Sequence, residues 1–344
     1  METQKLYIHD PEKDREAVEQ AGKILREGGL VAFPTETVYG LGANALLPDA
    51  AARIYQAKGR PSDNPLIVHV TEFSEVFSVA REVPPEAELL FRTFSPGPMT
   101  VILKKRPEIP DQVTAGLDTV AIRIPSHPAA RAVIAASGVP IAAPSANRSG
   151  KPSPTCAEDV AEDMEGRIDA IIYGGSSSVG VESTIIDLSG EIPTILRPGG
   201  ITPKDFLTVL PKVQLDRHVF HAVEGSERPK CPGMKYRHYA PEAEVIVYEG
   251  APERLELAIR EELSKNPKKP VAVLCMNWHD YDADLVIKVG TDNRDYAKNL
   301  FHALRKCDRE GMKLILAEFT EDDGYGLAVQ NRLYKSAGNH VLHI

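Results

Sequence analysis

Short apolar runs separated by polar turns fill the first two-thirds of the chain. Apolar runs bounded by turn residues predict strands, and apolar residues at a spacing of three and four predict helices. The predicted strands are residues 30–33, 66–70, 99–103, 119–124, 140–143, 170–173, 184–188 and 194–196, and the predicted helices are residues 17–25, 49–57, 72–80, 85–94 and 129–136. Strict alternation of strand and helix is missing, which favours one mixed, twisted sheet with helices.

The last third alternates more regularly. Strands are predicted at residues 245–247, 271–274, 285–289 and 314–317, and helices at residues 253–263, 296–307 and 327–334. This order is typical of a small, doubly wound, parallel α/β domain of the Rossmann-like kind. The fold class predicted for the whole chain is therefore α/β, with an open mixed sheet followed by a smaller parallel sheet.

Length and charge divide the chain further. A chain of 344 residues suggests about two domains, and a net charge of −9 argues against a protein that coats polyanions in general. Residues 211–240 are the basic exception, with six basic and three acidic residues among several prolines and glycines. This composition predicts a linker. The expected domains are residues 1–210 and 241–344, joined by residues 211–240.

Cysteine use and hydropathy indicate a compartment. The four cysteines are scattered, without the CxxC spacing of zinc or redox motifs, which favours reduced thiols in a cytoplasmic protein. We expect no signal peptide, because no long apolar stretch follows the first residues, and no membrane span, because no run approaches about 18 apolar residues.

Candidate chemistry lies at the ends of the predicted strands in the first domain. Basic and hydroxyl side chains gather there in several motifs, namely Lys58-Gly59-Arg60, Ser145-Ala146-Asn147, Arg123, Ser153, Ser183 and Arg197. Ligands commonly bind at strand ends in α/β sheets. Lysine, arginine and hydroxyl donors together suit a triphosphate, so the pattern predicts an anion cradle in a net acidic domain.

Taken singly, each motif also has a structural interpretation. Lys58 and Arg60 fit a solvated turn in a loop rich in glycine and proline, where burial is not expected. Ser145 and Asn147 are typical turn or capping residues. Other candidates fit the core (His69, Tyr39) or the surface (Arg197). Spacing alone therefore names no reaction.

Longer motifs carry a resemblance to a known family. The pairs Lys58-x-Arg60 and Ser145-x-Asn147 stand with the segments FPTETVYGLG at residues 33–42, SPGPMT at residues 95–100 and VEST at residues 181–184. So many motifs in order make a chance match very improbable. In these residues the chain resembles the threonylcarbamoyl-AMP synthase family, the YrdC-like proteins, in their longer two-domain form.

The resemblance implies a nucleotidyltransferase reaction. L-threonine, bicarbonate and ATP would give threonylcarbamoyl-AMP and pyrophosphate, with Mg²⁺ bridging the phosphates. Transferase proteins would pass the threonylcarbamoyl group to the tRNA adenosine beside the anticodon, in tRNAs that read ANN codons. The implied fold is an open twisted sheet with a concave basic face, followed by a Rossmann-like domain.

The resemblance also implies roles for individual residues. The catalytic tetrad would be Lys58, Arg60, Ser145 and Asn147. Threonine would be held by Thr37, His69, Arg123, Ser183 and the backbone near Ala143. ATP would contact Arg60, Asn64, Thr119, Ser145, Ser153, Arg197 and, from the linker, Tyr236. We also expect residues 211–240 to fold back as a lid, with a stiff tether as the alternative.

Two other functions stay open. A carbamoyltransferase of hydrogenase maturation contains a similar domain, but it also carries paired-cysteine zinc fingers, which the scattered cysteines do not match. A non-enzymatic RNA-binding module would use the concave face, although residues 1–210 carry 20 basic and 28 acidic residues. Oligomeric state, order of substrate binding, any general base, direct RNA contact and the second domain's role are not determined by the sequence.

Overall fold

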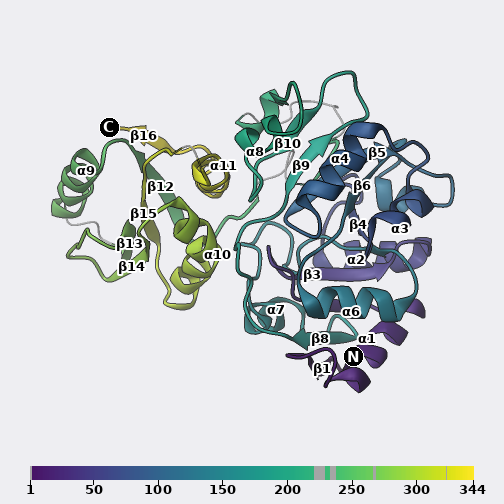
Figure 1. Ribbon diagram of the computed structural model, residues 1–344. Helices are drawn as coiled ribbons and strands as arrows, with labels where there is room; N and C mark the ends of the chain where they lie inside the picture. Colours follow the sequence, from purple (N-terminus) through teal and green to yellow (C-terminus); the bar gives the residue numbers. More distant parts are fainter. Residues whose placement is uncertain (1, 221–228, 233–237, 266–268, 323) are drawn as a thin grey trace. The chain divides into compact units, whose positions relative to one another are not determined.

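The computed structural model describes residues 2–220, 229–232, 238–265, 269–322 and 324–344. The chain divides into two compact units (Figure 1). The first contains residues 1–149 and 153–235, and the second contains residues 150–152 and 236–344. Each unit has its own sheet, so the two are described separately.

Helices and strands of the first unit follow one another irregularly. The strands are β1 (Gln4–Tyr7), β2 (Val31–Phe33), β3 (Gly40–Asn44), β4 (Ile67–His69), β5 (Met99–Lys104), β6 (Thr119–Arg123), β7 (Ile141–Ala142), β8 (Ala170–Tyr173), β9 (Thr184–Asp187), β10 (Thr194–Arg197) and β11 (Gln214–Leu215). The helices are α1 (Arg15–Arg26), α2 (Pro48–Lys58), α3 (Phe73–Val79), α4 (Pro85–Phe94), α5 (Asp111–Thr114), α6 (Pro128–Ser137), α7 (Ala157–Met164) and α8 (Pro203–Leu207), with a short 3-10 helix η1 (Arg217–Val219).

Within the described residues, the strands of this unit form one mixed sheet of eleven, in the order β1-β8-β2-β3-β7-β4-β6-β5-β9-β10-β11. Parallel and antiparallel pairs both occur: β4 runs parallel to β6, whereas β6 and β5 are antiparallel. The short strand β11 pairs with β10 at one edge, so the start of the basic segment 211–240 extends this sheet.

The two faces of this sheet pack differently. One face packs on α2, α3, α4, α5, α7 and α8 in the larger core, which includes Val68, Val101 and Ile122. On the other face, α1 and α6 cover the strands near β1, β8 and β2. The two helices lie close together because Gly22 of α1 has no side chain, and an added Cβ would stand 2.7 Å from the Ala136 carbonyl carbon.

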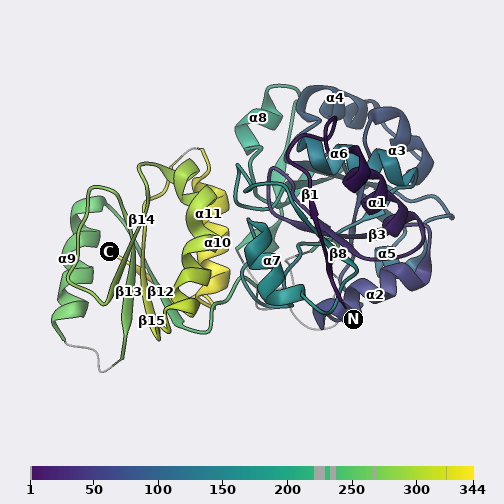
Figure 2. The ribbon, with the colours of Figure 1, turned by 90° about the horizontal axis from the view of Figure 1, so that it is seen from below.

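The second unit is a three-layer sandwich. Its strands are β12 (Glu244–Glu249), β13 (Val271–Met276), β14 (Leu285–Gly290), β15 (Leu314–Phe319) and β16 (Val341–His343), and its helices are α9 (Pro252–Ser264), α10 (Asn293–Arg309) and α11 (Gly326–Ser336). The described strands pair in the order β14-β13-β15-β12-β16, and all four pairs are parallel. Figure 2 shows α9 on one face of this sheet and α10 and α11 on the other.

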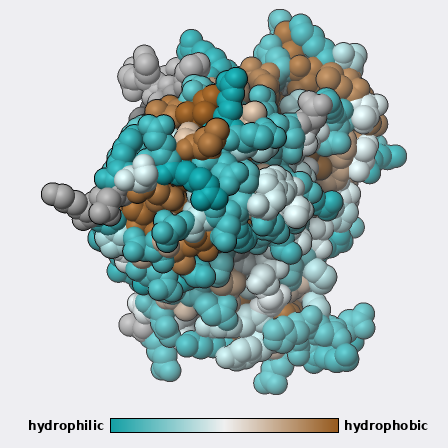
Figure 3. Space-filling view, turned by 90° about the vertical axis from the view of Figure 1, so that its left-hand side faces the viewer, coloured by the Kyte–Doolittle hydropathy of each residue, from teal (hydrophilic) through white to brown (hydrophobic). Residues whose placement is uncertain are grey.

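Apolar side chains also reach the surface. Leu257 and Trp278 of the second unit are 70% and 56% exposed. On the face seen in Figure 3, hydrophobic residues occupy separate areas bordered by hydrophilic ones. Among the helices of the described residues, none is both long enough and apolar enough to cross a membrane.

The predicted fold class is confirmed, because a mixed sheet with helices is followed by a smaller parallel sheet. Predicted strands and helices mostly fall within two residues of the observed bounds, and the strand at residues 170–173 coincides with β8. The sequence patterns did not predict strands β1, β11 and β16 or helices α5, α7 and α8, and β3 lies inside the segment that was interpreted only as a motif.

Candidate active site

Several of the candidate side chains lie on one face of the first sheet, opposite the larger core. Side chains alternate along a strand, so Thr119, Ala121 and Arg123 of β6 share a face. Parallel pairing sets His69 of β4 beside Arg123, and it sets Ile67 beside Ala121. An apolar cluster that includes Ile67, Ala121, Ile102, Ile185 and Leu196 forms the floor of this face. The sheet therefore supplies a rigid base for polar groups at the strand ends.

Arg123 is held in a fixed orientation at the end of β6. Its Nη2 donates to Glu36 Oε1 at 2.7 Å, and its Nη1 donates to Thr37 Oγ1 at 2.8 Å. The ion-paired side chains of Arg123 and Glu36 are only 5% and 8% exposed. Within the described residues, the buried Arg123 Nε has no hydrogen-bond partner. One donor of a rigid guanidinium therefore stays available to a ligand.

Glu36 keeps its charge in this buried position. Burial raises the pKa of its carboxyl, but the Arg123 guanidinium and several hydrogen bonds outweigh burial and lower the pKa below its usual value. One of these bonds comes from the Ser126 backbone N–H, which donates to Glu36 Oε2 at 3.1 Å. Glu36 and Arg123 therefore form a desolvated ion pair, whose two members depend on each other.

His69 supplies a neutral imidazole beside this pair. Burial, with the Arg123 charge adding to it, lowers the pKa of His69 to about 3. Its Nδ1 lies 3.1 Å from the Ile67 carbonyl oxygen, which fits a protonated Nδ1 that donates. At neutral pH the His69 side chain can therefore make a hydrogen bond or a packing contact, but it carries no positive charge.

Arg197, at the end of β10, and Ser183, just before β9, form a second polar group. Arg197 donates to Ser183 through Nε to the carbonyl oxygen and through Nη2 to Oγ, both at 3.1 Å. Ser183 Oγ also lies 2.7 Å from Thr100 Oγ1. Gly199 makes this approach possible, because an added Cβ would stand 2.5 Å from the Glu182 carbonyl oxygen and the Thr184 nitrogen. The segment that follows β10 therefore lies directly against the Glu182–Thr184 backbone.

Three members of the proposed tetrad meet around the Lys58 ammonium. Lys58 Nζ donates to the carbonyl oxygens of Ser145 and Asn147, both at 2.5 Å, and lies 3.3 Å from Asn147 Oδ1. The Ser145 hydroxyl donates to the same Oδ1 at 2.5 Å. The structure thus joins the end of α2 to residues 145–147 through one charged group.

The expectation that Lys58 lies in a loop where burial is improbable is wrong. Lys58 is the last residue of α2 and only 2% exposed. The turn comes one residue later, at Gly59, which has a φ of 62°. Because the carbonyl groups of another segment surround the ammonium, Lys58 stabilises the fold. Its contact with a nucleotide stays a prediction.

Arg60 follows two residues later, and a different segment of backbone holds its side chain. Its Nη2 donates to the carbonyl oxygens of Asn64 and Pro65, at 3.1 Å and 3.2 Å. The Asn64 side chain is 1% exposed, and within the described residues neither its Oδ1 nor its Nδ2 has a hydrogen-bond partner. A buried amide without a partner is costly. This orphaned amide suggests a ligand contact at Asn64.

The remaining predicted residues fall at the borders of the same face. Ser153 is 1% exposed, and its hydroxyl donates to Glu182 Oε1 at 2.5 Å. Thr119 begins β6, and the Ala143 backbone follows β7, where its N–H donates to the Ile67 carbonyl oxygen at 2.8 Å. Tyr236 lies outside the described residues. The ligand roles of all these residues stay predictions.

Part of the basic segment lies on the candidate face. Cys231 is fully buried in the apolar cluster that also contains Ile67 and Leu196. Lys230 Nζ lies 3.1 Å from Asp187 Oδ2, and the Asp187 side chain is only 4% exposed. These two contacts fix residues 230–231 to the face that carries the candidate residues.

Comparison with known proteins decides the family. Residues 23–199 match a family described as "Telomere recombination", and residues 201–338 match the "Threonylcarbamoyl-AMP synthase, C-terminal domain". A threonylcarbamoyl-AMP synthase of Pyrococcus abyssi is 48% identical over 96% of this chain and 98% of its own length. One from Bacillus subtilis is 46% identical over 99% and 97%. The chain belongs to the threonylcarbamoyl-AMP synthase family.

The similarity to this family extends to three dimensions. The crystal structure of Pyrococcus abyssi Sua5 complexed with L-threonine is 47% identical, has a TM-score of 0.94 and covers all of both chains. The resemblance read from the sequence motifs is therefore confirmed. The enzyme class is that of a nucleotidyltransferase.

Three polar residues of this site were not among the predicted site residues. Glu36 orients Arg123, Thr100 contacts Ser183, and Glu182 accepts the Ser153 hydroxyl. All three lie inside family motifs at residues 33–42, 95–100 and 181–184. A charged residue within an otherwise apolar or small-residue motif is the signal that indicates Glu36 and Glu182.

Proposed function

We propose that this chain joins L-threonine, bicarbonate and ATP into threonylcarbamoyl-AMP and pyrophosphate. The observation that carries the proposal is its similarity, over all of both chains, to the Pyrococcus protein whose structure contains L-threonine. The candidate face supports it independently, because a buried arginine with an available Nε and an orphaned amide at Asn64 both suit ligand binding.

At the amino-acid end, Arg123 would pair with the threonine carboxylate. Its orientation is set in advance by Glu36 and Thr37, so little side-chain freedom is lost on binding. The neutral His69, the Ser183 hydroxyl and the backbone near Ala143 would contact the rest of the amino acid. Because His69 carries no charge, it would not repel the threonine ammonium, which must lose a proton before the amine reacts.

At the nucleotide end, Lys58 and Arg60 would place positive charge beside the triphosphate. The Asn64 amide and the hydroxyl groups of Thr119, Ser145 and Ser153 would complete the ATP site. The Arg197 guanidinium would add a further positive charge. Asn147 would keep the Lys58 ammonium and the Ser145 hydroxyl in position. Such a site acts mainly by positioning and by stabilising the charge that develops on the phosphates.

The reaction would proceed in two stages. The threonine amine attacks the carbon of bicarbonate and water leaves, or it adds to carbon dioxide derived from bicarbonate and loses a proton, and either route gives a carbamate. A carbamate oxygen then attacks the α-phosphorus of ATP, the bond to the bridging oxygen breaks, and pyrophosphate departs with that electron pair. The protein's share is to bring the carbamate and the α-phosphate into line.

Magnesium would accompany the nucleotide. Mg²⁺ prefers oxygen ligands and usually keeps several waters, so phosphate and water oxygens would hold most of it. The Glu182 carboxylate, which accepts the Ser153 hydroxyl, is a hard oxygen donor that fits such an ion. When bound, Mg²⁺ neutralises charge on the departing pyrophosphate.

Residues 230–231 support a covering role for the basic segment. Cys231 is buried on the candidate face and Lys230 pairs with Asp187, so this part of the segment lies over that face. A cover matters because an acyl-adenylate product is open to hydrolysis. Trypsin should cleave after Lys230 several times more slowly when ATP and threonine are both bound. Equal cleavage rates with and without the ligands would reduce the segment to a tether.

The product must be consumed by a transfer reaction on tRNA. We infer that partner proteins carry the threonylcarbamoyl group to the adenosine, in the cytoplasm, and that this chain's own reaction does not require RNA. Measuring pyrophosphate release while threonine and bicarbonate are withheld in turn tests the proposal, because the reaction needs both.

A further inference from the structure

The sheet of the second unit has a point where its connections diverge. From β12 the chain crosses through α9 to β13, whereas from the adjacent β15 it crosses through α11 to β16. These crossovers run in opposite directions along the sheet, so α9 and α11 cover opposite faces (Figure 2). Ligands of open α/β sheets bind outside the carboxyl ends of two such strands.

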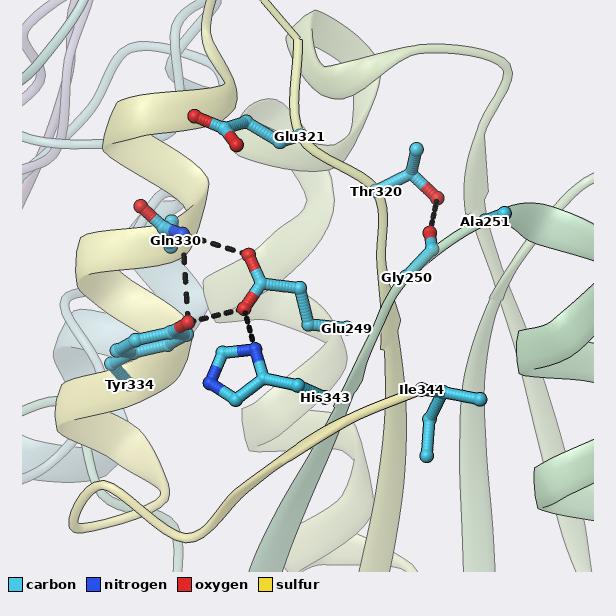
Figure 4. A pocket seen from close by; sticks show the side chains of 9 residues that line it. All are labelled: Glu249, Gly250, Ala251, Thr320, Glu321, Gln330, Tyr334, His343 and Ile344. Carbon is cyan, nitrogen blue, oxygen red and sulfur yellow. Dashed lines mark hydrogen bonds and ion pairs between the residues drawn. The ribbon is translucent and has the colours of Figure 1, made fainter.

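A pocket of about 590 Å³ lies at this point. Residues from four segments line it: the loop after β12, the loop after β15, helix α11 and strand β16. Figure 4 shows the Glu249 carboxylate at its centre, facing side chains from α11 and β16. The pocket therefore sits where the topology alone places a ligand site.

The groups around Glu249 are ordered in advance. Gln330 Nε2 donates to Glu249 Oε1 at 2.8 Å, and the Tyr334 hydroxyl donates to Oε2. His343 Nδ1 also lies 2.9 Å from Oε2 (Figure 4). In this contact Nδ1 donates to the Glu249 carboxylate. The His343 side chain is 71% exposed, so its ring reaches solvent while Nδ1 contacts Glu249.

The polar groups of the pocket that can still form hydrogen bonds are mostly acceptors. A carboxylate accepts about four hydrogen bonds, so Glu249 retains room for one more. Within the described residues, the exposed Glu321 carboxylate has no side-chain partner. The Gly250 carbonyl oxygen and the Thr320 hydroxyl, 3.0 Å apart, offer further lone pairs. Because the lining contains two glutamates and neither lysine nor arginine, the pocket is net negative.

Phosphate chemistry does not suit this pocket. The loop after β12 is short and is followed by Pro252 at the first position of α9, which removes one of the N–H groups that bind phosphate at helix starts. No cation in the lining offsets a phosphate charge. A ligand with several N–H donors and a positive charge satisfies both the lone pairs and the net charge.

We propose that the second unit binds a small organic cation, with an ammonium or guanidinium group, in the pocket around Glu249, Glu321 and His343. This site is separate from the proposed ATP and threonine site of the first unit. Its occupancy is therefore independent of whether the proposed synthase activity is correct.

The full chain, carrying ¹³C at the histidine ring Cε1, tests the proposal by NMR. Agmatine serves as the cation, and inorganic phosphate and adenosine serve as comparison probes. His343→Gln identifies the His343 signal. Agmatine should shift that signal and saturate by about 10 mM, where a ligand with a dissociation constant of roughly 1 mM is mostly bound. Phosphate and adenosine should leave the signal in place.

Two matched variants separate the pocket from general surface charge. Glu321→Gln should weaken agmatine binding about fivefold, because it removes one exposed charge partner. Glu310→Gln changes an exposed glutamate just after α10, outside the pocket lining, and should leave binding unchanged. The proposal is overturned by the absence of a saturable shift, by equal weakening in both variants, or by a shift with phosphate or adenosine instead of agmatine.

Discussion

Replacing Arg123 with methionine is expected to lower kcat/KM for threonine roughly 100-fold and to destabilise the first unit by about 3 kcal/mol. The activity falls because the charged partner for the threonine carboxylate is lost. The stability falls because Glu36, whose side chain is 8% exposed, stays buried as a carboxylate without its cation. A fall of about 10 °C in the thermal midpoint of the first unit would report this loss.

A double variant separates the two effects. Adding Glu36→Gln to Arg123→Met removes the stranded charge, so most of the lost stability should return while the activity stays low. If the double variant is as unstable as the single one, the buried pair is not the cause of the destabilisation. If Arg123→Met retains normal turnover with threonine, the assignment of the carboxylate site is wrong.

Replacing Lys58 with alanine is expected to cost about 3 kcal/mol of stability as well as activity. Hydrogen bonds from a charged donor are worth roughly 1.5–3 kcal/mol each when a buried partner would be left unsatisfied. Here two carbonyl groups, of Ser145 and Asn147, would lose their donor. Urea unfolding followed by circular dichroism measures the cost. Lys58→Arg should restore little stability, because a planar guanidinium does not fit the space between these carbonyl oxygens that holds a compact ammonium.

Lys23 of α1 offers a matched control for the Lys58 experiment. Its side chain is 69% exposed and its ion pair with Glu27 spans 3.9 Å, so Lys23→Ala should change stability by less than about 0.5 kcal/mol. If Lys58→Ala were as mild as Lys23→Ala, the ammonium would not hold α2 to residues 145–147. Lys58 would then serve only the nucleotide.

Most strands of the first unit were predictable because their short apolar runs are local features of the sequence. Residues 170–173 are apolar apart from a terminal tyrosine, and β8 occupies the same four positions. Strand β3 was not predictable in this way, since Gly40 and Gly42 weaken strand propensity. Its glycines are explained only by tertiary packing, because a Cβ on Gly42 would stand 2.7 Å from the Phe33 ring.

The sequence allowed us to predict which residues belong to the candidate site, but not how these residues are arranged in space. Family motifs named residues in Lys58-x-Arg60 and Ser145-x-Asn147, but the sequence gives no sign that Lys58 is buried among carbonyl groups 87 and 89 residues away. Likewise Glu36 reads as one acidic residue in a motif until the structure pairs it with Arg123, 87 residues further on. Burial and ion pairing depend on long-range contacts, which local patterns do not contain.

Pyrophosphate release in a buffer freed of carbon dioxide tests the central claim most directly. The proposed reaction releases pyrophosphate only when ATP, threonine and bicarbonate are all present, so withholding threonine or bicarbonate should reduce release to background. The Arg123→Met variant should give little release even with all three. Undiminished release without threonine, or without bicarbonate, would contradict the proposed synthesis of threonylcarbamoyl-AMP on this face.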